Sequence, residues 1–313
     1  MIRNNLKELY GIKYPIIQGG MAHVSSGAFA AAVSEAGAMG TIATAARDGA
    51  YAREQIRAAR KLTKQPFSVN IMLANPYCRE VIAVVLDEGV PLITTGAGNP
   101  APYMKDFLSN GCKVTSVVPH VRAAVKVEEL GVSAVVAEGG ESGGHVGSVS
   151  TFVLTAMVTE AVHIPVIAAG GIANGRGLIA AMALGAAGVQ MGTIFLATKE
   201  CPIHQAYKEK LLCAKETDTV VTGLGTKDPV RCLRNQLTDN YFEMVRMNVP
   251  VEELMKPLTG SLIRAVGGDI ETGSLQSGQI AGMLREIRTI REVIEDIMNG
   301  AEQALQEMKR LEA

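Results

Sequence analysis

The feature of the sequence that most constrains the fold is a pair of glycine turns, each of which follows an apolar run. Residues 165–168 are apolar and lead to Gly170-Gly171, and residues 189–191 lead to Gly192-Thr193, with an alanine-rich helical stretch between them. This order is that of two successive parallel strands. In an eight-stranded α/β barrel, the loops after strands seven and eight commonly bind phosphate, because small residues expose backbone N–H groups. The segment therefore predicts a barrel that binds a phosphorylated ligand.

The rest of the chain supports this expectation, because apolar runs alternate with helical patterns. The runs recur roughly every 20 to 30 residues, the length of a strand, a helix and two short loops. The expected strands centre on Ile16, Thr41, Val69, Ile93, Val114, Val135, Val166 and Val189. The expected helices span residues 28–36, 51–62, 77–88, 102–110, 121–130, 152–162 and 177–184. Five of them end at a glycine suited to a left-handed cap, namely Gly37, Gly89, Gly111, Gly131 and Gly185. The pattern predicts an α/β fold of the TIM (β/α)8 barrel type.

The pattern changes after the eighth expected strand. Residues 199–268 carry more charge and contain loop signals at residues 222–225 and 228–229, and an amphipathic helix is expected over residues 286–311. We therefore expect a barrel formed by residues 1–197 and 272–313, with a small, mostly helical lid subdomain at residues 198–271. Such an insertion would emerge at the carboxyl ends of the strands, where a lid could cover the site.

Composition excludes several classes of function. The net charge is −1, Trp is absent and aromatic residues make up 4% of the chain, so neither a basic surface for a nucleic-acid backbone nor a base-stacking surface is indicated. The five cysteines form no C-x-x-C pair, which favours reduced thiols and argues against structural zinc. No signal peptide core and no membrane-spanning apolar stretch are present in the sequence. We expect a cytoplasmic protein without a metal centre, nucleic-acid partner or membrane partner.

Three polar residues at expected strand ends are candidates for chemistry. His145 lies in a loop with five glycines, residues 137–147, and a histidine there can carry a proton at neutral pH, although a solvent-facing loop residue is the alternative. Asn70 could bind the edge of a heterocycle or cap local backbone. Glu138 could bind a ligand hydroxyl or hold a neighbouring turn. His23 and His120 also follow strands but stand alone, so structural roles are favoured for them, and His163 and His204 are expected to be structural or exposed.

Taken together, these motifs resemble the flavin-dependent family of FabK-type enoyl-acyl-carrier-protein reductases and nitronate monooxygenases. The resemblance covers nearly the whole chain and rests on residues 18–22, Asn70, residues 94–100, 137–139 with 143–145, 168–172 and 190–193, with further matches at 208–210, 231–238 and 278–282. Within the family, Glu138-Gly139 and residues 95–100 are more similar to the enoyl reductases. The monooxygenases tend to have arginine after the histidine, where this chain has Val146. His23 departs from the reductase pattern, which has tryptophan there, and residues 41–46 replace a glycine-rich stretch.

The resemblance implies FMN, with NADH or NADPH as the hydride donor. It places the flavin phosphate at Gly170, Gly171, Gly192 and Thr193, the ring against the backbone of Gly20, Met21 and Ala22, and the ring edge and ribityl chain at Asn70 and Glu138. The full expected cofactor set adds Gly143, Gly144, Ala169, Gln190 and Met191. A hydride would pass through the flavin to the β-carbon of a trans-2-enoyl thioester, as in the last step of fatty-acid elongation, and His145 would supply or relay the α-carbon proton.

The resemblance also implies partners and leaves rivals open. An acyl carrier protein, a homodimer and a response to a monovalent cation are expected from it. Basic residues at the mouth would bind the acidic carrier, and the candidates are Lys199, Lys208, Lys210, Lys215, Lys227, Arg231 and Arg234. A nitronate monooxygenase would use the same barrel and FMN, with His145 as a base and oxygen as the oxidant. A phosphosugar isomerase or lyase would bind no flavin, and a non-catalytic barrel would leave His145 without a purpose.

Overall fold

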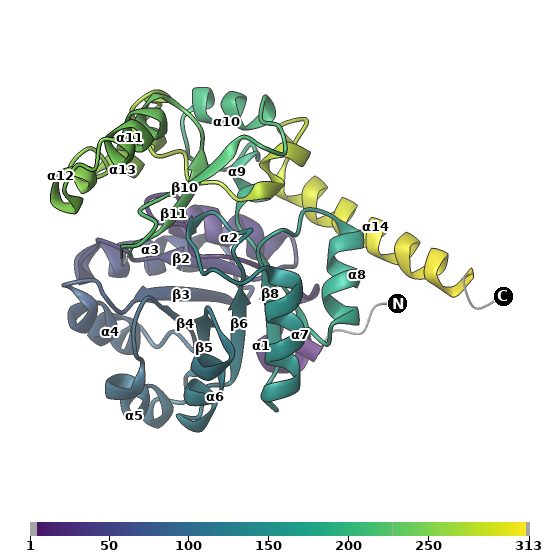
Figure 1. Cartoon of the computed structure of the whole chain (residues 1–313). Helices are drawn as coiled ribbons and strands as arrows, with labels where there is room; N and C mark the ends of the chain where they lie inside the picture. Colours follow the sequence, from purple (N-terminus) through teal and green to yellow (C-terminus); the bar gives the residue numbers. More distant parts are fainter. Residues whose placement is uncertain (1–4, 227, 311–313) are drawn as a thin grey trace.

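The protein is built on a barrel of eight parallel strands surrounded by helices (Figure 1). The computed structural model describes residues 5–226 and 228–310. The barrel strands are β1 (Ile16–Gln18), β2 (Gly40–Ala43), β3 (Phe67–Met72), β4 (Leu92–Gly96), β5 (Lys113–Val118), β6 (Ala134–Glu138), β8 (Val166–Ala169) and β9 (Gly188–Met191). Each expected strand centre lies within one of these strands, so the predicted TIM barrel is confirmed.

The sheet closes on itself through the first two strands. Its order is β1-β9-β8-β6-β5-β4-β3-β2, and a parallel bridge between Ile17 and Met39 joins its two ends. Two backbone hydrogen bonds make this closure, from Gln18 N to Met39 O and from Met39 N to Ile16 O, both 2.9 Å long. Closure places the carboxyl ends of all eight strands around one opening, which is where barrels of this type carry ligands.

The amino-terminal end of the barrel is plugged by a short helix, α1 (Asn5–Tyr10). Its Leu6 and Tyr10 are buried and cluster with Ile17, Val136 and other residues of the barrel interior. The hydroxyl of Tyr10 lies 2.6 Å from Thr115 Oγ1, which satisfies its polar atom inside this apolar cluster. This end is therefore filled with side chains, and only the opposite end is open to a ligand.

Helices follow the strands as the sequence predicts, with ends that differ by one or two residues. They are α2 (Gly27–Glu35), α3 (Gly49–Leu62), α4 (Cys78–Asp87), α5 (Ala101–Ser109), α6 (Val121–Glu129), α7 (Thr151–Ala161) and α8 (Gly175–Ala183). The five glycines expected at helix ends all have positive φ angles, between 60° and 94°. Sequence reasoning therefore located both the helices and their C-terminal caps.

The described part of the segment expected to form the lid, residues 198–226 and 228–271, is an appendage that lies over the open end of the barrel (Figure 1). Beyond the short α9 (Thr193–Leu196), it contains α10 (Gln205–Leu212), α11 (Gln236–Arg246), α12 (Val251–Met255) and α13 (Ser261–Val266). It also contains a hairpin that sequence reasoning missed, β10 (Thr219–Thr222) and β11 (Val230–Leu233), whose turn is the expected loop signal. The hairpin adds a third strand, β7 (Gly144–His145), from the barrel's glycine loop.

Two expectations for the carboxyl-terminal third need correction or limits. Lys208 does not belong to a basic surface, because it is buried and its Nζ donates a 2.7 Å hydrogen bond to the carbonyl of Thr198. The terminal helix α14 (Ile290–Lys309) begins four residues later than predicted, because Thr289 and Glu292 form a capping box there. Leu311, the predicted helix end, and Lys227 lie outside the described residues. In the described part, no helix has the length and apolarity to cross a membrane.

Candidate active site

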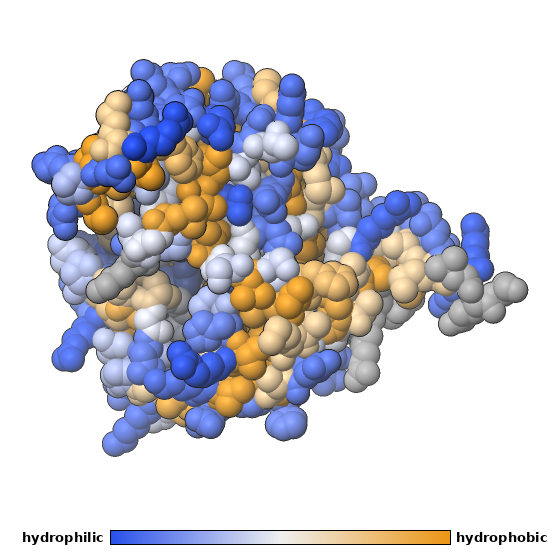
Figure 2. Space-filling view, viewed as in Figure 1, coloured by the Kyte–Doolittle hydropathy of each residue, from blue (hydrophilic) through white to orange (hydrophobic). Residues whose placement is uncertain are grey.

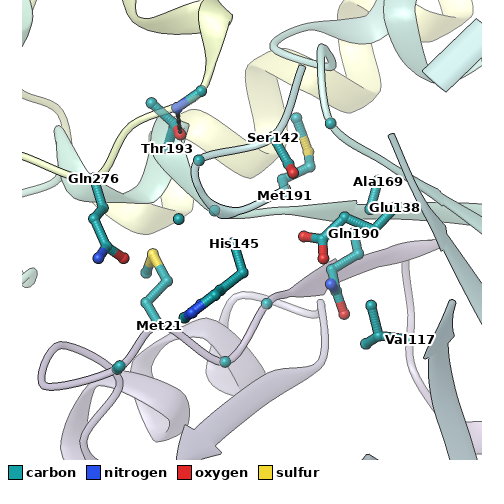
Figure 3. A pocket seen from close by; sticks show the side chains of 18 of the residues that line it. Met21, Val117, Glu138, Ser142, His145, Ala169, Gln190, Met191, Thr193 and Gln276 are labelled. Carbon is teal, nitrogen blue, oxygen red and sulfur yellow. Dashed lines mark hydrogen bonds between the residues drawn. The ribbon is translucent and has the colours of Figure 1, made fainter. Parts of the chain in front are cut away.

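A cavity opens at the carboxyl ends of the barrel strands, and all fifteen predicted site residues line it. Figure 3 shows Glu138 and Gln190 together at one end, Thr193 and Gln276 at the other, and Met21 and His145 between them. The appendage and the segment after it contribute Tyr207, Leu262, Gln276 and Ile280 to the wall. The cavity is therefore formed between barrel and appendage, with a polar floor and several apolar walls.

The loop after β1 is held in place by a buried glutamine. Gln18 is fully buried, and its Nε2 donates to Ser25 Oγ over 2.8 Å and to the carbonyl of Gly19. Ser25 Oγ in turn accepts a 2.9 Å hydrogen bond from Met21 N, while Gln18 Oε1 accepts from Thr41 N. These bonds fix the backbone of the loop before any ligand arrives, which is the kind of preorganisation that a binding site requires.

Gly20 approaches Asn70 so closely that no side chain can fit between them. A Cβ placed on Gly20 would lie 2.5 Å from both Cβ and Nδ2 of Asn70. The glycine is therefore required by the neighbouring side chain from β3 and not by its own backbone angles. The consequence is that the loop backbone and the Asn70 amide border the same part of the cavity.

The predicted phosphate site is a set of small residues with available donors. Gly170 and Gly171 have φ angles of 99° and 71°, and at Gly170 a Cβ would lie 2.8 Å from Thr151 Oγ1. Gly192 is the N-cap residue of α9 and has no side chain, so the first backbone N–H groups of this helix receive no hydrogen bond from a capping side chain. Thr193 Oγ1 accepts a 2.8 Å hydrogen bond from Gly278 N, which leaves the hydroxyl proton free to donate to a ligand (Figure 3).

Glu138 and Gln190 lie in one row across the barrel. The register pairs Glu138 with Ala169 and Ala169 with Gln190, so a small buried residue separates two polar ones. Burial raises the pKa of Glu138 from 4.5 to about 7. The nearby Ser142 hydroxyl opposes this shift, although it forms no hydrogen bond of good geometry to the carboxyl. Near neutral pH, this carboxyl can therefore either donate or accept a hydrogen bond at the floor of the cavity.

His145 lies on a short strand and not on a free loop. β7 pairs with β11 through Val230 opposite His145 and Arg231 opposite Gly144. Arg231 strengthens this junction, because its Nε donates a 2.9 Å hydrogen bond to the carbonyl of Gly140. The imidazole itself is 56% exposed at the cavity wall, 3.9 Å from Asp228. The backbone is thus fixed while the ring can reach both the cavity and solvent.

Two buried polar atoms of the cavity wall lack any hydrogen-bond partner. These are Asn70 Oδ1 and Ser142 Oγ. Buried polar atoms are nearly always paired in native proteins, so unpaired atoms on a cavity wall indicate a ligand that satisfies them. Isoalloxazine has a ring N–H that suits Asn70 Oδ1, the ribityl chain has hydroxyls that suit Ser142, and phosphate suits the Gly192 and Thr193 region. The residues therefore fit FMN.

Several wall residues were missed from the sequence, notably Ser142, Glu141, Tyr207 and Gln276. Ser142 and Glu141 lie in the glycine loop itself, and the loop composition was the available signal. Tyr207 and Gln276 come from segments whose arrangement over the barrel no sequence pattern reveals. His120 and His204 are structural, as expected, because each accepts a backbone hydrogen bond at the start of a helix, α6 and α10 respectively.

Comparison with known proteins gives a consistent family. The family model of nitronate monooxygenase matches residues 3–81 and 75–300. Among solved structures, FabK from Thermotoga maritima is 44% identical, with a TM-score of 0.96 over 99% of this chain and 100% of that one. A probable nitronate monooxygenase of Staphylococcus saprophyticus is 32% identical over 87% of this chain and 90% of the relative.

A third relative is named for different chemistry. It is a Mycobacterium tuberculosis dehydrogenase named for a carboxyl-CoA substrate, 32% identical over 95% of both chains. The match to the family model covers more than nine tenths of this chain, so phosphosugar isomerase chemistry loses its support. The chain belongs to the nitronate monooxygenase family, a group of flavin-dependent oxidoreductases that includes FabK-like proteins.

Proposed function

We propose that this protein is an FMN-dependent enoyl reductase that saturates the trans-2 double bond of enoyl thioesters with NADH or NADPH. The observation that carries the proposal is the likeness to FabK, 44% identical over essentially the whole of both chains, against 29% for a nitroalkane oxidase of Streptomyces ansochromogenes. The relative named for a carboxyl-CoA substrate adds support for a thioester.

The cavity residues would hold FMN along its length. Gly170, Gly171, Gly192 and Thr193 would receive the phosphate, Ser142 the ribityl chain, and the backbone of residues 20–22 with Asn70 the ring. When bound, FMN supplies hydride transfer from the nicotinamide to the β-carbon of the enoyl thioester. The buried Asn70 Oδ1 and the fixed β1 loop orient the ligand, and the appendage residues Tyr207 and Leu262 limit water at the site.

In this proposal His145 delivers the proton that completes the reduction. A hydride at the β-carbon leaves negative charge at the α-carbon and thioester oxygen, and one proton at the α-carbon balances the reaction. The imidazole lies at the cavity wall and contacts solvent, so it can transfer a proton inward and be reprotonated from water. The pairing of β7 with β11 fixes the backbone of His145.

One observation favours a second candidate, nitronate monooxygenase activity. The matching family model and the staphylococcal relative carry that name. In that reaction His145 would act as a base at the cavity wall, oxygen would be the oxidant, and no nicotinamide would be consumed. The same residues would hold FMN, so the two candidates differ in substrate and not in cofactor site.

The proposed partners are an acyl carrier protein and a second copy of the chain. Of the basic candidates for the carrier, Lys199 and Lys215 are exposed, whereas Arg234 is paired with Asp239. For the homodimer, α7 offers an exposed apolar row made of Phe152, Val153 and Met157. Figure 2 shows apolar surface over the region of α7. An exposed row of this kind is typical of an interaction surface.

A paired steady-state assay tests the proposal. The flavin-loaded protein is given NADH or NADPH with crotonyl-CoA in one cuvette, and ethyl nitronate with oxygen in another. The proposal expects crotonyl-dependent oxidation of the nicotinamide, with butyryl-CoA as the product, to exceed oxygen uptake with the nitronate by at least tenfold in kcat/KM. Rapid oxygen uptake without nicotinamide oxidation would instead establish the second candidate.

A further inference from the structure

His23 and Arg47 form a polar pair on two neighbouring loops, and other residues of these loops line the cavity. His23 follows the cavity-lining Ala22 in the loop after β1, and Arg47 lies two residues beyond the cavity-lining Ala45 in the loop after β2. Arg47 Nη2 lies 3.2 Å from His23 Nδ1. This pair takes no part in the proposed cofactor site, whose phosphate end lies at the loops after β8 and β9.

The tautomer of His23 follows from this contact. A guanidinium has only donors, so His23 Nδ1 must accept and the neutral ring carries its proton on Nε2. Burial, with the charge of Arg47 as a second cause, lowers the pKa of His23, which is consistent with a neutral ring. The pair therefore presents one full positive charge and one additional N–H donor.

The positive charge of Arg47 has no acidic partner within salt-bridge distance in the described part of the chain. Its Nε is buried without a hydrogen-bond partner, and its guanidinium stacks 4.7 Å from the centre of the Tyr51 ring. Asp48, the adjacent carboxylate, caps α3 by accepting from Tyr51 N. A guanidinium that is positioned by its neighbours but lacks a counter-ion is suited to bind an anion.

The backbone around the pair is fixed and strained. Asn75 Nδ2 donates hydrogen bonds of 2.9 and 2.8 Å to the carbonyls of Thr44 and Arg47, which ties the second loop to the third. His23 and Ala46 have positive φ angles of 61° and 55°, a conformation that costs free energy for residues other than glycine. Strain that persists in two adjacent loops bordering a cavity is typical of a functional site.

We propose that His23 and Arg47 bind a phosphate group of the substrate outside the flavin. This inference rests on the proposed function, whose substrates both carry phosphate: the nicotinamide dinucleotide in its pyrophosphate, and the thioester in its CoA or phosphopantetheine arm. Arg47 supplies the charge and His23 Nε2–H a second donor. The shared ligand chemistry is a phosphate ester, and the following experiment separates its two sources.

The test compares Arg47→Met, Arg47→Lys and His23→Asn with Arg122→Met. Asparagine tolerates the positive φ angle at position 23. Arg122 is an exposed arginine in the first turn of α6, so its removal matches the charge change away from the pair. Each flavin-loaded variant is assayed with NADH and either crotonyl-CoA or crotonyl-N-acetylcysteamine, which lacks phosphate.

A thioester source predicts that Arg47→Met raises KM for crotonyl-CoA about tenfold, with KM for the truncated thioester and for NADH unchanged. A nicotinamide source predicts the same rise in KM for NADH with either thioester. In both cases KM rises less in Arg47→Lys and His23→Asn than in Arg47→Met, and Arg122→Met has the KM of the wild type. Unchanged KM values for NADH and crotonyl-CoA, or an equal rise in KM for crotonyl-CoA and for the truncated thioester, would overturn the proposal.

A binding measurement separates failure of this inference from failure of the proposed function. If no enoyl thioester is reduced, calorimetric titration of inorganic pyrophosphate into the flavin-loaded protein still tests the pair. Binding about tenfold weaker in Arg47→Met than in Arg122→Met would support an anion site. Equal binding in the two variants, or none in the wild type, would refute it.

Discussion

Replacing Gly20 by alanine should damage both the fold and the cofactor site, through one identified contact. The new methyl group would lie 2.5 Å from Asn70 Cβ and Nδ2, about 1 Å inside the ~3.5 Å at which carbon atoms pack favourably. The crowded atoms are a side-chain root and its amide, on a barrel strand that pairs on both sides, so they cannot simply move away. Overpacking of this kind costs about 1 to 3 kcal/mol of unfolding free energy.

The assay measures the urea-induced unfolding of the flavin-free protein and the flavin content of the purified protein. Gly96→Ala is the matched control, because it lines the same cavity but its Cβ would meet Val117 at an ordinary 3.7 Å. We expect Gly20→Ala to lose stability and most of its flavin, and Gly96→Ala to change stability by less than about 0.5 kcal/mol.

A second background identifies the contact responsible. In Asn70→Gly, the atoms that the new methyl group would strike are absent, so Gly20→Ala should cost much less there than in the wild type. This non-additivity is the signature of two residues in direct contact. If Gly20→Ala costs the same in both backgrounds, the steric argument is wrong.

Three further predictions follow from the site and the surface. Because burial raises the pKa of Glu138 from 4.5 to about 7, the folded flavin-free protein binds this proton more tightly than the unfolded chain. The unfolding free energy should therefore fall as pH rises from about 4.5 through 7, by up to about 3 kcal/mol. Urea unfolding of Glu138→Gln should lack this pH-dependent component, and identical pH profiles for the wild type and the variant would refute the prediction. His145→Gln should lower the rate of enoyl thioester reduction ~100-fold or more in stopped-flow traces while leaving flavin reduction by nicotinamide unchanged; equal loss in both steps would argue against a role as proton donor. Phe152→Glu should convert the proposed homodimer to monomer in sedimentation velocity, whereas an unchanged sedimentation coefficient would place the interface elsewhere.

Much of the barrel could be predicted because its signals are local. Each strand and helix has its own apolar period, and glycines such as Gly37 and Gly185 mark helix ends by a backbone angle that other residues rarely adopt. The cavity residues were predictable for the same reason, since barrel topology places every strand end at one opening. Gly170 and Thr193 thus line one cavity, although they follow two different strands of the barrel.

The features that sequence reasoning missed depend on contacts between distant segments. The β10–β11 hairpin is short. The pairing of β11 with Gly144 and His145 joins segments about 85 residues apart, as the register of Val230 with His145 shows. Burial of Lys208 depends on the carbonyl of Thr198, which lies outside its own helix. The His23 and Arg47 pair likewise requires two loops to be adjacent, which only the closed barrel establishes.

The most direct test of the central claim is an anaerobic absorbance titration of the purified protein. NADH is added first, NADPH if NADH has no effect, and then crotonyl-CoA. The account predicts a yellow protein whose flavin absorbance bleaches with the nicotinamide and returns on addition of the enoyl thioester. A flavin that ignores both nicotinamides yet turns over alkyl nitronates with oxygen would contradict the reductase assignment, and a protein that binds no flavin after incubation with FMN would contradict the cofactor site itself.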